Sequence, residues 1–193
     1  MGKSNFVFGY GSLVNILNLE QYLGRKLIPG ADFIICNLNN FRRCWNVAMD
    51  NSLDLPDYKY YCDRLTGNRL PGFVTFLNIY SSESDAIAGI LFSVTNAELQ
   101  NLDRRERNYY RIDITAKIDA NINGTAWTYV GLNEACKRYQ TGLEQKNGMI
   151  CGDYFNLVYD AYSLLGDRFL VHYTATTDKP IVPIVDLEKY RVK

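Results

Sequence analysis

Apolar and polar residues alternate or cluster in short runs over the first two thirds of the chain, and this pattern predicts strands. The predicted strands cover residues 5–10, 31–36, 44–48, 72–79, 87–94, 111–118 and 125–132. A polar, tyrosine-rich segment, 50–71, interrupts the series. We expect it to form a long surface loop that could cover a site, because functional residues are often carried on such loops.

Apolar residues at helical spacing predict four helices. The first begins directly after the first strand, with Ser12 as its expected N-cap and Gly24 as its expected end. The second starts after the capping box Thr95-Asn96-Ala97-Glu98. From the second onward the predicted helices cover 96–107, 134–140 and 151–165, and an extended tail follows.

The strands at 111–118 and 125–132 flank Asn123-Gly124, a dipeptide that favours two-residue hairpin turns. We expect an antiparallel hairpin here, and we prefer the turn over a glycosylation site at Asn123-Gly124-Thr125. Strands followed by helices predict an α+β fold with a mostly antiparallel, barrel-like mixed sheet and flanking helices. The length fits a single domain, 1–193, with its core at 5–130 and C-terminal helices and tail at 133–193.

Charge and composition narrow the classes of function. Lysine plus arginine and aspartate plus glutamate both number 21, so no net field attracts nucleic acid or an anionic membrane. No run approaches a membrane span of roughly 20 apolar residues, and no signal-peptide core precedes the first strand. Five cysteines without metal-site spacing are expected to be reduced thiols, which indicates a cytoplasmic protein. A single histidine, His172, argues against a metal site or a histidine-dependent triad.

The first strand runs into Gly9-Tyr10-Gly11-Ser12-Leu13, which places two glycines before an expected helix start. Unpaired amides and the positive end of a helix dipole would favour an anion there. Nucleotide-binding patterns are absent, because the third glycine position holds Val14 and no Gly-Lys-Ser/Thr ending follows. A tight strand-to-helix turn without a ligand explains the spacing equally well.

Glu106 is the second candidate for chemistry. Counted from the capping box, it shares an apolar helical stripe with Leu99 and Leu102. An inward carboxylate costs on the order of several kcal/mol unless it is paired or functional. A buried salt bridge to Arg111 or Arg42 and a catalytic role would both explain it.

The residues around Glu106 on this helix are expected to take ordinary positions. Arg104, Arg105 and Arg107 should project to the flanks or to solvent, and Asp103 at the edge of the stripe could orient a neighbour. We expect burial of Glu106 to raise its pKa more than these arginines lower it.

Four segments in order form a more specific combination than any of them alone. They are Phe8-Gly9-Tyr10-Gly11-Ser12-Leu13, Ala88-Gly89-Ile90-Leu91-Phe92-Ser93-Val94, Leu102-Asp103-Arg104-Arg105-Glu106 with Tyr109-Tyr110, and Thr128-Tyr129-Val130. This order resembles the γ-glutamylcyclotransferase superfamily over residues 5–130. Phe41-Arg42-Arg43-Cys44-Trp45, Pro71-Gly72-Phe73-Val74 and Arg105-Glu106 are most similar to its ChaC-type branch, which acts on glutathione, although that branch's histidine-bearing segment has no counterpart here.

The resemblance implies an enzyme that converts a γ-glutamyl amide into 5-oxoproline and a free amine or amino acid, without cofactor or metal. Glu106 would be the catalytic base. The amides of Gly11, Ser12 and Leu13 would anchor the substrate's α-carboxylate, and Tyr10 would wall or hydrogen-bond the glutamyl group. Tyr129 matches a family position and is expected beside the site.

The expected partner is therefore a small γ-glutamyl molecule, such as glutathione, a γ-glutamyl dipeptide or a γ-glutamyl amine. An alternative from another class is a binding module that holds a γ-glutamyl or amino-acid ligand without turning it over. The near-zero net charge and the 15 tyrosines are compatible with a homodimer.

Overall fold

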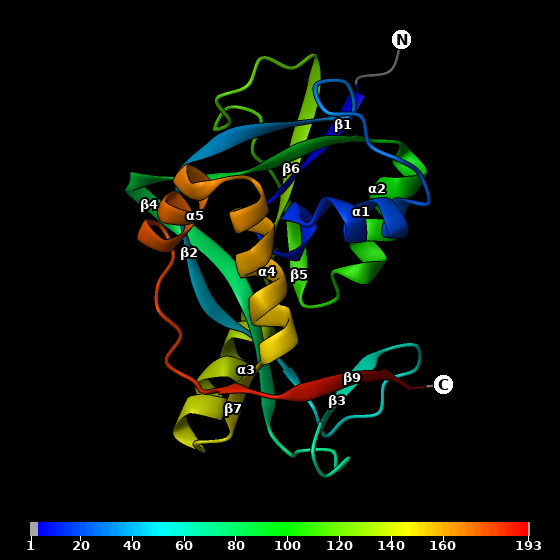
Figure 1. Cartoon of the computed structure of the whole chain (residues 1–193), viewed down its shortest axis with the longest axis vertical. Coiled ribbons are helices and arrows are strands. Elements are labelled where there is room, and N and C mark those ends of the chain that lie inside the picture. The colour runs from blue at the N-terminus through cyan, green and yellow to red at the C-terminus, as the bar shows by residue number, and fades with distance from the viewer. Residues whose placement is uncertain (1–3, 193) are drawn as a thin grey trace.

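A mixed sheet forms the centre of the structure, a computed structural model that describes residues 4–192 (Figure 1). Residues 1–3, which entered our expectation that no secretory leader is present, lie outside this range. Over the described residues the sheet has seven strands, in the order β5-β6-β1-β4-β7-β8 with β2 paired to β4. Their bounds are β1 Ser4–Gly9, β2 Phe33–Asp50, β4 Phe73–Val94, β5 Tyr109–Asp113, β6 Gly124–Gly131, β7 Gly148–Cys151 and β8 Ile184–Val185.

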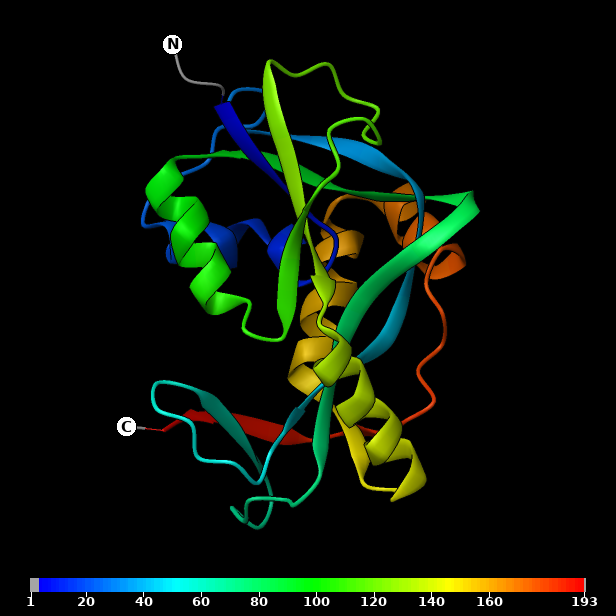
Figure 2. The ribbon, with the colours of Figure 1, turned by 180° about the vertical axis from the view of Figure 1, so that it is seen from behind.

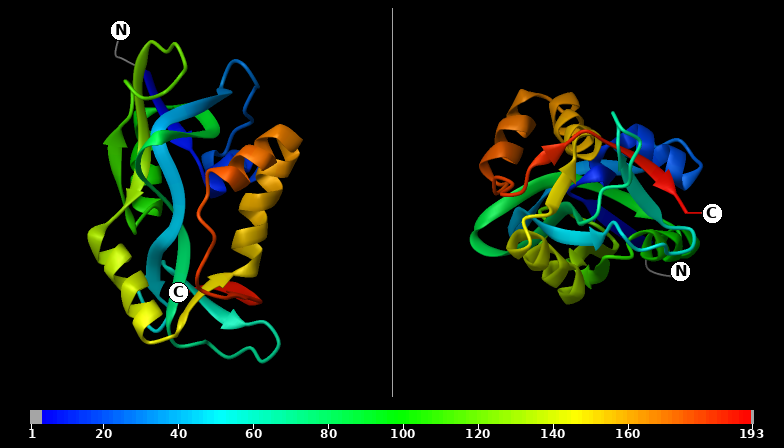
Figure 3. Two further views of the ribbon diagram at one scale, coloured as in Figure 1. Left: turned by 90° about the vertical axis from the view of Figure 1, so that its left-hand side faces the viewer. Right: turned by 90° about the horizontal axis from the view of Figure 1, so that it is seen from below.

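Strand β4 organises this sheet. It pairs with β2 along nearly its whole length, and β1 pairs with its last part, residues 90–94. Both of these pairs are antiparallel, whereas β7 runs parallel to the start of β4 and β6 runs parallel to β1. The long β2 and β4 curl together through the molecule (Figures 1 and 3). The predicted α+β class, with helices flanking a mixed sheet, is confirmed.

The four strands expected between residues 31 and 94 are in fact two long strands. The polar stretches that separated them in the sequence stay in the sheet, with register shifts between Asn39 and Phe41 and between Trp45 and Val47. Asn40 adopts a positive φ of 63° at the first shift. Such irregularities bend a strand without ending it, so a break in the apolar pattern is not a break in the strand.

The predicted pairing between residues 111–118 and 125–132 is observed as β5 and β6, but the predicted turn is wrong. Residues 114–123 form a longer connection, whose backbone bonds to β2 through Asn39 N–H to Lys117 O at 2.9 Å and Asp119 N–H to Asn37 O at 3.0 Å. Gly124 instead begins β6, where a Cβ atom would clash with the Ser4 carbonyl of β1. Gly124 therefore allows β6 and β1 to approach closely, and it does not form a tight turn.

A second sheet corrects our expectation for segment 50–71 and includes part of the tail, which is extended as predicted. Strand β3, Lys59–Asp63, lies within that segment and pairs antiparallel with β9, Leu187–Arg191. Figure 1 shows this two-stranded ribbon at the bottom of the molecule, away from the upper part of the main sheet. The segment is thus anchored by the C-terminal tail and is not simply a loop.

Five α-helices and one 3₁₀ turn are present in residues 4–192: η1 Ser12–Val14, α1 Ile16–Leu23, α2 Asn96–Arg105, α3 Asn133–Glu144, α4 Gly152–Leu164 and α5 Asp167–Ala175. The helices predicted in the last third correspond to α3 and α4, whereas α5 was not predicted. Helices α4 and α5 lie on one side of the long strands and α3 lies on the other (Figure 3, left). None of these helices is both long enough and apolar enough to cross a membrane.

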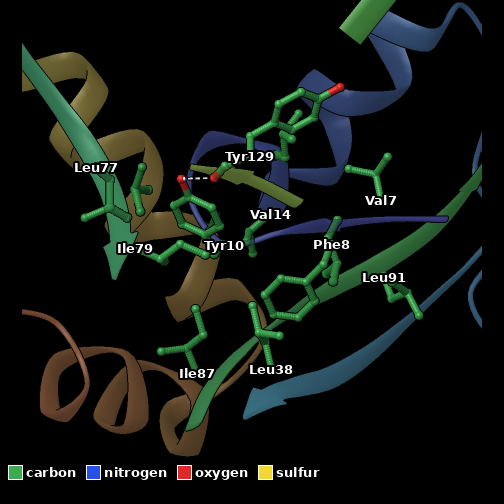
Figure 4. Close-up of a cluster of buried hydrophobic side chains, with 14 of the residues drawn as sticks. Val7, Phe8, Tyr10, Val14, Leu38, Leu77, Ile79, Ile87, Leu91 and Tyr129 are labelled. Atoms are coloured by element: carbon green, nitrogen blue, oxygen red, sulfur yellow. Dashed lines mark hydrogen bonds between the residues drawn. The ribbon is translucent and has the colours of Figure 1, made fainter. Parts of the chain in front are cut away.

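The main core joins the end of β1 to the long strands. Phe8 of β1 lies towards Leu38 and Leu91 of β2 and β4, whereas Val7 lies on the opposite face of β1 (Figure 4). All of these residues, together with Ile87, belong to one buried cluster. All of these side chains are 1% exposed or less. This packing fixes the backbone that leads into the glycine loop. The five cysteines are free thiols, as expected.

Candidate active site

The glycine loop turns sharply back at the end of β1. A Cβ atom on Gly9 would lie only 2.7 Å from the Cβ of Leu13, so this position needs a glycine. Tyr10 is buried, and its hydroxyl donates a 2.8 Å hydrogen bond to the backbone oxygen of Tyr129 on β6 (Figure 4). The two strand ends are thereby linked across the loop.

The helix predicted to start at Ser12 in fact starts four residues later, at Ile16. Residues 12–14 form a single 3₁₀ turn, closed by Val14 N–H to Gly11 O at 2.9 Å. Helix α1 begins at Ile16 with Asn15 as its N-cap, and the Asn15 side chain accepts from Asn18 N–H at 3.0 Å. A helix dipole therefore does not act on the loop amides, and the expected anion site depends on the amides themselves. The end of α1 at Gly24 is as predicted.

A buried arginine holds the loop from behind. Arg43 of β2 is 0% exposed and donates through Nε to the Tyr10 carbonyl at 3.1 Å. Its Nη2 donates to the Ala88 carbonyl and to the Tyr162 hydroxyl, and its Nη1 donates to Thr176 Oγ1 at 2.9 Å. These neutral acceptors and the facing Tyr162 and Tyr173 rings compensate a buried cation.

Glu106 lies just beyond α2 and not within it. The predicted capping box at the start of the helix is present, with both reciprocal bonds between Thr95 and Glu98. The helix ends at Arg105, and Glu106 is its C-cap, with φ −85° and ψ 50°. The helical count predicted that Glu106 would continue the stripe of Leu99 and Leu102. The carboxylate does not do so, because the helix ends before it. It leaves the helix towards the glycine loop, with 17% of its side chain exposed.

Removal from water raises the pKa of Glu106, and the nearby Arg105 and Lys59 lower it in part. This direction is the one predicted. Arg105 was expected to project away from Glu106. Instead, its Nε lies 3.5 Å from Glu106 Oε1. Within residues 4–192 this 3.5 Å contact is the only ion pair of Glu106, and its carboxylate accepts no hydrogen bond.

The two salt bridges proposed as a structural role for Glu106 are absent from the described residues. Arg111 pairs with Asp103 at 2.7 Å, and Arg42 pairs with Asp178 at 2.7 Å. The carboxylate is therefore withdrawn from water without a strong partner. This state is costly for a merely structural group and common for a functional one.

The six residues predicted for the site line a single pocket. Its empty space is about 340 Å³, which includes open solvent at its mouth. The lining consists of the last aromatic residue of β1, the glycine loop, Leu77, the acid and three further tyrosines: Phe8, Gly9, Tyr10, Gly11, Ser12, Leu13, Leu77, Glu106, Tyr109, Tyr129 and Tyr154.

Most of the tyrosine hydroxyls around the pocket are used internally. Tyr129 donates to Asp103 Oδ1 at 2.8 Å, so Asp103 does orient a neighbour. Tyr109 donates to the Leu77 carbonyl at 2.7 Å and forms part of the wall. These bonds fix the rings in place, and burial raises the pKa of Tyr10, Tyr109 and Tyr129. The tyrosines are therefore neutral walls.

Sequence reasoning did not assign Leu77, Tyr154 or Lys59 to the site. Tyr154 carried a usable signal, because it lies on the predicted apolar face of 151–165. Lys59 carried none, since it belongs to a segment read as a loop. Within residues 4–192 no group of three His, Cys, Asp or Glu side chains is arranged to hold a metal ion.

The fold and this pocket define a small α+β protein with an acidic, tyrosine-walled pocket at the end of its first strand. The chain belongs to the gamma-glutamyl cyclotransferase, AIG2-like family, whose model matches residues 7–151. The match extends past residue 130, where the resemblance of motifs ended, and includes α3 and β7. Direct comparison with the sequences of curated proteins gives no match.

Several solved structures are similar to this one. A protein from Arabidopsis thaliana is 20% identical, with a TM-score of 0.44 over 75% of this chain and 85% of that one. A gamma-glutamyl cyclotransferase is 14% identical, with a TM-score of 0.44 over 74% and 80%. A yeast gamma-glutamyl cyclotransferase specific to glutathione is 13% identical, with a TM-score of 0.40 over 90% and 97%.

Proposed function

We propose that this protein is an enzyme that cyclises a γ-glutamyl amide to 5-oxoproline and releases the attached amine or amino acid. The observation that carries the proposal is Glu106, a carboxylate withdrawn from water without a strong partner at a pocket bounded by the glycine loop. Membership in the gamma-glutamyl cyclotransferase family supports the reaction type.

The chemistry needs one group that moves a proton. The substrate's α-amine attacks its own γ-carbonyl carbon, which forms the ring C–N bond, and the bond to the leaving nitrogen breaks. Glu106 takes the proton from the attacking amine and returns it to the leaving nitrogen. A carboxylate with a raised pKa suits both steps, because a base near its working pH can also act as an acid. Atoms and charge balance without water or a co-reactant.

The loop supplies position. The amides of Gly11, Ser12 and Leu13 anchor the α-carboxylate, and this holds the α-amine near the γ-carbonyl for ring closure. Tyr10 is a wall for the glutamyl chain, because its hydroxyl is already donated to Tyr129. Arg43 acts behind the loop as a positioning residue for the Tyr10 backbone.

The test is detection of 5-oxoproline by mass spectrometry after incubation of the purified protein with glutathione, a γ-glutamyl dipeptide or a γ-glutamyl amine. Glu106→Gln should fold and make no product, and Glu144→Gln, at an exposed glutamate of α3, is the matched control. Turnover by Glu106→Gln at the wild-type rate would refute the mechanism. Tight binding of a γ-glutamyl ligand without product over long incubation would favour the binding module.

A further inference from the structure

Lys59 is a cation that the mechanism above does not use. It is the first residue of β3, and β9 of the C-terminal tail holds this strand in place. Its ammonium lies 3.9 Å from the centre of the Phe76 ring. Within residues 4–192 the ammonium of Lys59 makes no hydrogen bond, and no carboxylate lies within 4.0 Å of it. By contrast, Lys26 is 85% exposed and pairs with Glu20 at 2.7 Å.

The ring under Lys59 connects it to the pocket. Phe76 packs edge-on against Tyr154, with 5.1 Å between the ring centres, and Tyr154 lines the pocket. Lys59 itself does not line the pocket. Figures 1 and 2 show that the end of α2, where Glu106 follows, is directed towards the β3–β9 ribbon.

Neighbouring contacts also bring the β3 segment to Glu106. Arg107 Nη1 donates to the Pro56 carbonyl at 3.1 Å, and Asn108 donates to the Tyr58 hydroxyl at 2.8 Å. Arg107 directly follows Glu106, and Tyr58 directly precedes Lys59. The ammonium therefore lies outside the γ-glutamyl pocket but on the Glu106 side of it.

We propose that Lys59 binds the carboxylate of the leaving group, so that the preferred substrates are γ-glutamyl amino acids or peptides whose released part carries a carboxylate. The proposal rests on the proposed function, because it takes the glutamyl group to occupy the pocket and its leaving nitrogen to face Glu106. In that pose the leaving group extends out of the pocket towards β3. An uncharged γ-glutamyl amine would leave the ammonium without an anion.

The electrostatics of Lys59 agree with a cation that awaits an anion. Removal from water lowers its pKa to about 8, and the carboxylate of Glu106 raises it in part while Lys189 and Arg105 lower it further. The Phe76 ring gives partial compensation only, since a cation–π contact is weaker than a charge-assisted hydrogen bond. A bound carboxylate would complete this environment.

The experiment compares γ-glutamyl-alanine with γ-glutamyl-alaninamide, which differ at the leaving-group carboxylate. Steady-state kinetics are measured for the wild type, Lys59→Met, Lys59→Arg and Lys189→Met. Methionine keeps the apolar stem of the side chain, and Lys189, exposed on β9, is the matched control. Binding of both ligands to the same four proteins is measured by calorimetry, and melting curves confirm folding.

We expect Lys59→Met to raise KM for γ-glutamyl-alanine about 10- to 100-fold, the usual effect of losing a hydrogen bond to a charged group, and to leave the amide within about 3-fold. Lys59→Arg should retain most of the discrimination, and Lys189→Met all of it. An equal rise in KM for both ligands would place Lys59 at the glutamyl carboxylate and overturn the proposal. An unchanged KM for both ligands would also overturn it.

The binding data separate this proposal from the proposed function. If the wild type makes no 5-oxoproline, the proposed function fails, but preferential binding of γ-glutamyl-alanine that Lys59→Met abolishes would still support Lys59 as the carboxylate-binding residue. Equal binding of the two ligands to the wild type, or no binding of either, would refute it.

Discussion

The hydroxyl of Tyr10 donates a 2.8 Å hydrogen bond to the backbone oxygen of Tyr129, so the glycine loop is tied to the neighbouring strand β6 through a side chain that also faces the pocket. This bond decides between the two roles that the sequence left open for Tyr10. Because the hydroxyl already donates to a protein oxygen, Tyr10 forms part of the pocket wall and does not hydrogen-bond the ligand.

Tyr10→Phe should therefore change stability more than substrate binding. We expect the free energy of unfolding to fall by about 1 kcal/mol, because a buried hydrogen bond is lost, and KM to change less than about 3-fold. Urea denaturation and steady-state kinetics provide the measurements. Tyr190→Phe, whose hydroxyl contacts Glu188 at the surface, should behave like the wild type. A large rise in KM for Tyr10→Phe would show that the hydroxyl binds substrate after all.

Adjacent arginines on β2 should differ strongly in their contribution to stability. Arg43→Met removes a buried guanidinium that serves the Tyr10 and Ala88 carbonyls, and we expect a loss of roughly 3 kcal/mol. Arg42→Met breaks ion pairs with Asp178 and Asp85 near the surface, and a loss of about 1 kcal/mol or less is expected. Chemical denaturation of both variants measures the difference. Equal losses would mean that the neutral acceptors around Arg43 contribute little.

The two loop glycines make a second matched pair. A Cβ on Gly9 would meet Leu13 at 2.7 Å, so Gly9→Ala should destabilise the fold by about 1–3 kcal/mol through overpacking. A Cβ on Gly11 would lie 3.6 Å from the Tyr154 hydroxyl and 3.7 Å from Leu77, which is ordinary contact. Since Tyr154 and Leu77 line the pocket, Gly11→Ala should fold normally and raise KM about 10-fold, as a methyl group displaces ligand.

Melting curves and kinetics on both glycine variants test this contrast. Unchanged KM in a well-folded Gly11→Ala protein would show that the ligand does not occupy this part of the pocket.

The sequence predicted those features that depend on local pattern. The capping box before Asn96, the end of α1 at Gly24 and the pairing of β5 with β6 each follow from a few neighbouring residues. The apolar run at Phe6-Val7-Phe8 likewise identified the buried strand that carries the loop. Family motifs then selected six residues that the fold brings to one pocket.

Features that depend on distant parts of the chain were missed for physical reasons. Strand β3 pairs with β9 more than a hundred residues away, and its polar, tyrosine-rich sequence gives no period that reveals a partner. Lys59 and Tyr154 reach the site area only through such tertiary placement. Glu106 was predicted to lie within the helix, but the helix ends one residue earlier, at Arg105. Glu106 begins a turn instead, in which the Tyr109 N–H donates to the Glu106 backbone oxygen at 2.9 Å.

The stability of the protein should report whether Glu106 is held for function or for structure. Its pKa is raised in the folded state, so its contribution to stability is present below the unfolded-state pKa of about 4.3 and is lost as pH rises through the folded pKa. At pH 7 the ionised carboxylate therefore costs stability. Glu106→Gln should be more stable than the wild type at pH 7, and this gain should shrink as pH falls towards 4.

Glu98→Gln provides a control with the opposite sign. Burial alone would raise the pKa of Glu98, but hydrogen bonds from Arg25 and Thr95 lower it overall, so its stabilising contribution is present at pH 7 and declines in acid. The cations facing Glu106 are Arg105 and Lys59, and the other titratable neighbours are tyrosines, which stay neutral between pH 4 and 7. Urea denaturation at both pH values compares the two variants. If Glu106→Gln lost stability at pH 7 as Glu98→Gln does, the contact with Arg105 would be a structural salt bridge, and the catalytic assignment would lose its main support.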